Sequence, residues 1–184
     1  MEMNRVAEKI DEKLHEKIKK VRLLVLDVDG VMTDGKIIID DLGNETKHFH
    51  VRDGHGIKML IRHGIDVVLL TGRKSAVVEH RAKDLGISEV HQGAHDKLIV
   101  INEILRSKSL SYENVAFIGD DIVDVPVLKR AGFSVTVFDA SDHIKRYVHY
   151  ITKKAGGAGA VREVCEIILH AQDKWNDVAK KYEI

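Results

Sequence analysis

The chain has 184 residues, of which 44% are hydrophobic and 32% are charged, a composition typical of one globular domain. Twenty-nine basic residues balance twenty-nine acidic residues, which gives no electrostatic basis for binding nucleic acid or an anionic membrane surface. No apolar run approaches the roughly 20 residues needed to span a bilayer. The single cysteine, Cys165, excludes an internal disulfide and a cysteine metal cluster, so we expect a cytoplasmic protein.

The first twenty residues predict an N-terminal helix. Apolar residues recur there every four positions, at Val6, Ile10, Leu14 and Ile18, which gives a narrow stripe along one helix face. This stripe could pack on the domain or on another subunit.

Three continuous apolar runs follow, each ending in polar residues, at 21–27, 66–72 and 114–120. Such runs are typical of strands that are buried on both faces, as in a parallel sheet. Shorter strands are expected at 89–91, 134–138 and 148–152, and helical patterns lie between the strands, at 54–63, 75–85, 95–107, 123–131 and 159–171. This alternation predicts an α/β fold with a doubly wound, mostly parallel sheet.

One stretch breaks the alternation. Residues 36–51 read as strand, turn and strand, which predicts an inserted β-hairpin. The final segment, 172–184, is polar apart from a few apolar side chains that could dock onto another subunit. We therefore expect a single domain over residues 1–184, consisting of the N-terminal helix (1–20), the α/β core with its hairpin, and a C-terminal tail.

Polar residues follow the three main strands. Asp27 and Asp29 follow the first, Thr71 ends the second, and Asp120 with Asp121 ends the third. Ligands of open parallel sheets bind outside the carboxyl ends of the strands, so these side chains should converge. Two other residues should join them, one a turn beyond Asp120 and one at a helix start: Asp124 and Lys97.

Five carboxylates in one cleft require a cation. Two unit charges about 4 Å apart repel by roughly 4 kcal/mol at an effective dielectric of 20. A set of oxygen ligands without cysteine favours a hard ion, and Mg²⁺ is the ion we expect.

The motifs resemble those of the haloacid dehalogenase superfamily. DxDGxxTD begins at Asp27, a strand ends in Thr71-Gly72-Arg73, a lysine stands at Lys97, and GDDxxD covers residues 119–124. All four occur in the family's order. The resemblance implies a phosphatase of the same doubly wound, Rossmannoid fold. The short insertions after the first and second strands imply that it has no cap domain.

The resemblance also implies roles. Asp27 would attack phosphorus and carry the phosphoryl group, and Asp29 would act as acid and then as base. Thr71 and Lys97 would bind phosphoryl oxygens. The metal would lie between Asp27, the backbone carbonyl of Asp29 and Asp120. Asp121 and Asp124 would orient metal-bound water and Lys97.

Within the superfamily, the chain most resembles the capless 3-deoxy-D-manno-octulosonate 8-phosphate phosphatases of lipopolysaccharide precursor synthesis, on segments 27–35, 49–58, 69–75, 78–87, 119–128 and 156–164. The capless cleft, the inserted hairpin and the apolar tail together suggest a homotetramer in which the hairpin of one subunit covers the cleft of its neighbour. The chain departs from the family at two positions, with histidine for asparagine at 50 and alanine for arginine at 158. Residues expected to contact substrate are His50, Arg52, Asp53, Gly54, Lys58, Gly72, Arg73 and Arg81.

Three other functions compete with this one. A nonulosonate 9-phosphate phosphatase would share the same catalytic set. A catalytically idle domain serving assembly or regulation is disfavoured by the intact Asp27 and Asp29. A receiver domain, which also uses aspartate, Mg²⁺, threonine and lysine, is disfavoured by the DxDG pattern and by the inserted hairpin.

Overall fold

The computed structural model describes residues 11–184, so the first part of the predicted N-terminal helix lies outside the described residues. The described part is helix α2 (Glu12–Lys19). Asp11 caps it by accepting a hydrogen bond of 2.7 Å from the backbone N–H of Leu14. Ile18 is fully buried and Leu14 packs against the core, so α2 packs on the domain through the described part of the predicted apolar stripe.

The core is a six-stranded sheet in the order β5-β4-β1-β6-β7-β8, and every neighbouring pair is parallel. Its central strands are buried on both faces, as their continuous apolar runs predict. The predicted α/β fold with a doubly wound parallel sheet is therefore confirmed. The strand bounds are β1 (Leu23–Leu26), β4 (Asp66–Leu70), β5 (Glu89–His91), β6 (Val115–Gly119), β7 (Phe133–Thr136) and β8 (Tyr150–Ile151).

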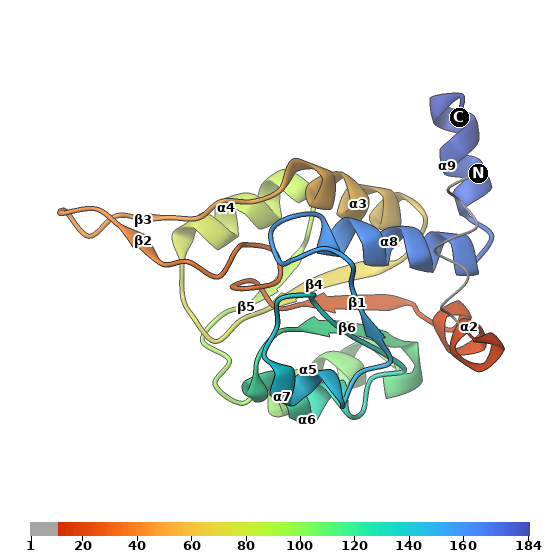
Figure 1. Ribbon diagram of the computed structural model, residues 1–184, viewed down its shortest axis with the longest axis horizontal. Helices are drawn as coiled ribbons and strands as arrows, with labels where there is room; N and C mark the ends of the chain where they lie inside the picture. Colours follow the sequence, from red (N-terminus) through yellow and green to blue (C-terminus); the bar gives the residue numbers. More distant parts are fainter. Residues whose placement is uncertain (1–10) are drawn as a thin grey trace.

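Helices cover both faces of this sheet (Figure 1). One face carries α3 (Val51–Arg62), α4 (Ala76–Leu85) and α8 (Ala160–Ala171). The other carries α5 (Lys97–Lys108), α6 (Val125–Leu128) and α7 (Asp142–Lys145). Two short 3₁₀ helices flank β6, at η1 (Tyr112–Asn114) and η2 (Ile122–Asp124).

The inserted hairpin is present but contains less strand than the sequence pattern suggests. Only β2 (Ile38–Ile39) and β3 (Glu45–Thr46) pair, in antiparallel register, and the hairpin projects away from the body of the domain (Figure 1). Its second arm leaves the ladder after Thr46. The expected strand over 45–51 ends at Thr46, and the chain then continues to α3, which begins at Val51.

The C-terminal tail contains a helix, α9 (Trp175–Tyr182), which the sequence analysis treats only as a polar segment with apolar anchors. Val178 is buried, and the ring of Trp175 stacks on His170 of α8 at 4.6 Å between centroids. No helix within residues 11–184 is both long and apolar enough to cross a membrane.

Candidate active site

The loop after β1 forms the floor of the site. The backbone N–H of Asp27 donates to the carbonyl of Ile118 in β6, and one Asp27 carboxylate oxygen accepts from the N–H of Val28 at 2.7 Å. Gly30 has a positive φ of 84°, and a Cβ there would lie 2.0 Å from an Asp120 oxygen. Only glycine therefore lets the loop approach Asp120 so closely.

Lys97 at the start of α5 is buried between two carboxylates. Its Nζ lies 2.8 Å from Asp27 Oδ2 and 2.6 Å from Asp124 Oδ1. Asp124 is fully buried, and its other oxygen accepts from the backbone N–H groups of Asp120 and Asp121 at 3.0 and 3.3 Å. Asp124 thus has its oxygens occupied by Lys97 and the backbone, which suits it to hold Lys97 beside Asp27.

Three carboxylates crowd together beside this lysine. One oxygen from each of Asp27, Asp120 and Asp124 lies within 4.8 Å of the others. Burial, and then the charge of Asp124, raises the pKa of Asp27 to about 6. Burial, followed by the charges of Asp27 and Asp124, raises the pKa of Asp120 to about 7. A hard divalent cation between Asp27 and Asp120 would relieve this repulsion, so the residues fit such an ion.

A cavity of about 410 Å³ opens at the carboxyl ends of the strands. The expected convergence of motif residues is therefore what the structure shows. Thr71 is almost fully buried, and its Oγ1 accepts from the Arg73 backbone N–H at 3.3 Å. The motif residues that line the cavity are Asp27, Asp29, Thr71, Gly72, Arg73, Lys97, Asp120 and Asp121.

The predicted substrate contacts of the 50–54 segment lie elsewhere. His50 and Arg52 line a second, larger cavity of about 650 Å³ between α3 and the start of α8. Asp53 is buried and accepts from the backbone N–H groups of Gly159 and Arg162, which joins α3 to α8. Within one subunit these residues do not reach the cavity that holds Asp27, and their contacts with substrate stay predictions.

Two further predicted substrate contacts, Lys58 and Arg81, meet at Asp84 of α4. Arg81 Nη1 lies 2.7 Å from an Asp84 oxygen, and Lys58 Nζ lies 3.8 Å from the other. The Arg81 guanidinium also stacks 5.5 Å from the ring centre of Phe49. A Cβ at Gly54 would lie 2.4 Å from Arg81 Nη2, so the glycine makes room for the arginine. In this structure the pair supports the packing of α3 on α4, and its role towards substrate stays a prediction.

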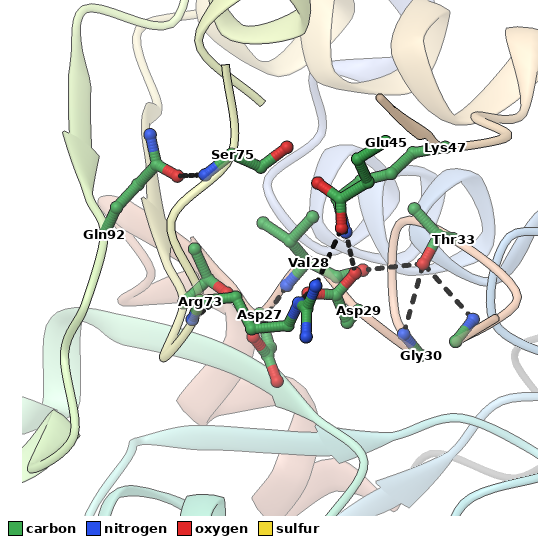
Figure 2. A network of polar contacts seen from close by, with 12 residues as sticks. Asp27, Val28, Asp29, Gly30, Thr33, Glu45, Lys47, Arg73, Ser75 and Gln92 are labelled. Atoms are coloured by element: carbon green, nitrogen blue, oxygen red, sulfur yellow. Dashed lines mark hydrogen bonds and ion pairs between the residues drawn. The ribbon is translucent and has the colours of Figure 1, made fainter. Parts of the chain in front are cut away.

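Sequence reasoning did not single out Lys47 and Glu45, which enter the site from the hairpin (Figure 2). Lys47 is buried and forms ion pairs with Asp29 and, at 3.3 Å, with Glu45. Glu45 also pairs with Arg73 at 2.9 Å. One weak signal exists, a lysine two residues beyond a glutamate on a predicted strand, which places both side chains on one face.

The glycine-rich segment before α8 packs against the loop that follows β1. Gly157 donates its backbone N–H to the carbonyl of Val31 at 3.0 Å. A Cβ at Gly156 would lie 1.8 Å from the carbonyl oxygen of Gly30. Ala158 and Gly159, the next residues along the chain, line the larger cavity. The glycine-rich segment therefore connects that cavity to the loop that carries Asp29.

Comparison with known proteins gives the same family along nearly the whole chain. The sequence profile of haloacid dehalogenase-like hydrolases matches residues 86–164. A 3-deoxy-D-manno-octulosonate 8-phosphate phosphatase of Yersinia pestis is 50% identical over 154 residues, covering 84% of this chain and 82% of that protein. The Escherichia coli K12 enzyme of the same name is 45% identical over 161 residues, covering 88% of this chain and 86% of its own.

Solved structures agree with the sequence relatives. The phosphatase of that name from Moraxella catarrhalis, in complex with magnesium, phosphate and a KDO molecule, superposes with a TM-score of 0.91 at 40% identity. The match covers 92% of this chain and 98% of that one. A probable phosphatase of the YrbI family from Pseudomonas syringae gives a TM-score of 0.92 at 43% identity, covering 95% of this chain and 99% of that one.

Proposed function

Because the chain belongs to the 3-deoxy-D-manno-octulosonate 8-phosphate phosphatase family of haloacid dehalogenase-like hydrolases, we propose that it hydrolyses this sugar-acid phosphate to the free acid and phosphate. The chain is thus a phosphoric monoester hydrolase. The observation that carries the proposal is the buried Lys97, held between Asp27 and Asp124 at the end of the cleft that also contains Asp29 and Thr71.

The proposed reaction has two steps. A carboxylate oxygen of Asp27 attacks phosphorus, the bond between phosphorus and the sugar oxygen breaks, and Asp29 donates a proton to that oxygen. Asp29 then accepts a proton from water, which attacks the aspartyl-phosphate and releases phosphate. Lys97 and Thr71 bind the phosphoryl oxygens through both steps and offset their charge.

We propose Mg²⁺ as the ion, held by the Asp27 carboxylate, the Asp29 backbone carbonyl and Asp120. A bound Mg²⁺ supplies charge neutralisation to the phosphoryl group and to the crowded carboxylates. Activity should vanish with a chelator and return with Mg²⁺, whereas Ca²⁺ should inhibit because its larger, looser coordination shell spoils the in-line geometry. Full activity in excess chelator would contradict the carboxylate-cluster argument.

The nucleophile is tested by Asp27→Asn, which should fold and bind ligand but lose turnover because an amide cannot attack phosphorus. Asp29→Asn should also lose turnover, since it cannot carry a proton. Asp34→Asn is the matched control, because Asp34 is an exposed carboxylate in the same motif. Ordinary phosphatase rates from Asp27→Asn would refute the mechanism, whereas a wild-type protein without turnover on any sugar phosphate would favour the alternative of an idle domain serving assembly or regulation.

The sugar is tested by comparing kcat/KM on the eight-carbon acid 8-phosphate and on a nonulosonate 9-phosphate. We expect the eight-carbon substrate to be preferred, because the family relationship points to it. Arg81→Ala should lower kcat/KM on that substrate about ten- to a hundred-fold if Arg81 binds its carboxylate. A clear preference for the nine-carbon substrate would show that the sugar is wrong while the phosphatase chemistry stands.

We also propose a homotetramer in which the hairpin of one subunit covers the cleft of the next. Three apolar hairpin side chains support this, since Ile37, Ile39 and Leu42 are 57%, 58% and 88% exposed in the single chain. Leu42→Asp should then shift the protein to smaller species in light scattering and lower its activity. A wild-type monomer with full activity would contradict the proposal. On the family relationship, we place the enzyme in the cytoplasm, in lipopolysaccharide precursor synthesis.

A further inference from the structure

Lys47 is a buried cation that the reaction described above does not use. Its side chain is 1% exposed and lies between the carboxylates of Asp29 and Glu45. Burying a lysine is costly even when it is paired, and a buried ion pair is weak evidence of a stabilising role. The identity of its partner therefore says more about the role of Lys47 than its burial does. That partner is Asp29, the residue proposed to carry protons in both steps.

The hairpin delivers Lys47 to the cleft. Lys47 follows β3, where the second arm leaves the ladder and runs back to the start of α3 (Figure 1). Lys47 Nζ is hydrogen-bonded to Asp29 Oδ1, and Arg73 Nε lies 3.8 Å from Asp29 Oδ2 (Figure 2). One oxygen of Asp29 is thus held by a hydrogen bond, and the other, further from its cation, is the freer one to exchange a proton.

Glu45 closes the arrangement into a ring of alternating charges. It lies 3.3 Å from Lys47 Nζ and 2.9 Å from Arg73 Nη2, so it holds both cations that face Asp29. Rotation of the Asp29 carboxylate away from Lys47 would break the hydrogen bond between them. A positioned acid works only when its oxygen stays within hydrogen-bond reach of the group it serves.

We propose that Lys47 is the positioning residue for Asp29, with Glu45 as the link to Arg73, and that the hairpin thereby sets the geometry of proton transfer within its own subunit. The inference rests on the proposed phosphatase chemistry. It differs from the proposal that the hairpin covers a neighbouring cleft, because every contact in the ring belongs to one chain.

The test uses two substrates whose leaving groups differ in their need for an acid. Expulsion of a sugar alkoxide needs a proton from Asp29, whereas para-nitrophenolate leaves readily without one. Lys47→Met, which keeps the stem of the side chain, should lower kcat/KM on 3-deoxy-D-manno-octulosonate 8-phosphate about ten- to a hundred-fold, part of the usual contribution of general acid catalysis. On para-nitrophenyl phosphate the loss should stay below about threefold.

Three variants separate positioning from a structural effect. Lys47→Arg should restore much of the selective loss, because it keeps a cation near Asp29. In an Asp29→Asn background, Lys47→Met should change the residual rate on the sugar phosphate less than about threefold, since its partner is gone. Lys108→Met is the matched control, as Lys108 also pairs with two carboxylates, Asp66 at 3.1 Å and Glu89 at 3.0 Å, and it should leave both substrates unaffected.

Equal losses on the two substrates, or full additivity with Asp29→Asn, would overturn the proposal and make Lys47 merely structural. If Lys47→Met fails to fold, Glu45→Gln provides the same test, because it breaks the ring while leaving Lys47 in place. Its loss should again fall selectively on the sugar phosphate. Failure of the proposed function is recognised separately, because Asp27→Asn would then retain turnover.

Discussion

Replacing Asp120 by asparagine should stabilise the metal-free protein at neutral pH, although we propose this residue as a metal ligand. In the folded chain, burial and the charges of Asp27 and Asp124 raise the pKa of Asp120 from its ordinary 3.8 to about 7. Between about pH 4 and pH 7 the native state therefore binds more protons than the unfolded state, and stability falls as pH rises through this window.

The structure sets the size of the effect. A pKa rise from 3.8 to about 7 corresponds to at most about 4 kcal/mol, since one pH unit is worth about 1.4 kcal/mol. Asp120 is only partly buried and shares its repulsion with Asp27, so we expect about 2–3 kcal/mol. For a chain of this size that is a rise in Tm of about 5–10 °C for Asp120→Asn at about pH 7.5.

The assay is thermal or urea unfolding of both proteins at one concentration, with chelator, across this pH range. The difference should vanish below about pH 3, where Asp120 is protonated in the folded and in the unfolded wild type, and grow towards pH 7. With Mg²⁺ at a thousandfold excess over Kd the order should reverse, because the wild type gains about 4.1 kcal/mol, more than the advantage of the variant. Asp142→Asn is the control with the opposite sign, since Lys145 lowers the pKa of that exposed carboxyl. A metal-free Asp120→Asn protein that is less stable at neutral pH would refute the reasoning.

Two other predictions concern packing. Gly156→Ala places a Cβ 1.8 Å from the Gly30 carbonyl oxygen, so it should lower the free energy of unfolding in urea by at least about 2 kcal/mol and lower activity. Gly64→Ala is the control, because a Cβ there has nothing within 4 Å. Its φ of 76° should cost only about 1 kcal/mol of backbone strain. Equal costs would show that the contact at Gly156 is relaxed easily. Burial raises the pKa of the Cys165 thiol well above its usual range, so a thiol reagent should label it only on unfolding; rapid labelling of the native protein, followed by absorbance, would contradict that burial.

The sequence predicted the sheet and the strand-end residues of the site because both depend on local pattern. A strand whose residues are all apolar must be covered on both faces of the sheet, and such strands are typical of the interior of a parallel sheet. Once the strands are parallel, their carboxyl ends share one edge, so Asp27, Thr71 and Asp120 converge whatever the details of packing. The same logic gave Lys97 its place at the start of the helix after β5.

Local pattern was less informative where the chain leaves the sheet. The helix expected at 54–63 begins at Val51, which makes His50 its N-cap and puts Asp53 in its first turn. The helix expected at 123–131 is reduced to η2 and the four residues of α6. Apolar spacing marks a helix face, but it leaves the first and last turns of the helix unspecified.

Contacts between distant segments were decided by the tertiary structure alone. Lys47 meets Asp29 because the hairpin arm bends back after β3, and no periodicity in residues 36–51 encodes that bend. Arg52 lines the larger cavity and not the cleft that contains Asp27. The reason is that α3 packs on α8, which begins more than a hundred residues later. The sequence by itself determined which motif residues share one cleft, because strand ends in a parallel sheet must meet. Which side chains position those groups depends on long-range packing, and only the folded chain brings Lys47, Glu45 and Arg73 around one carboxylate.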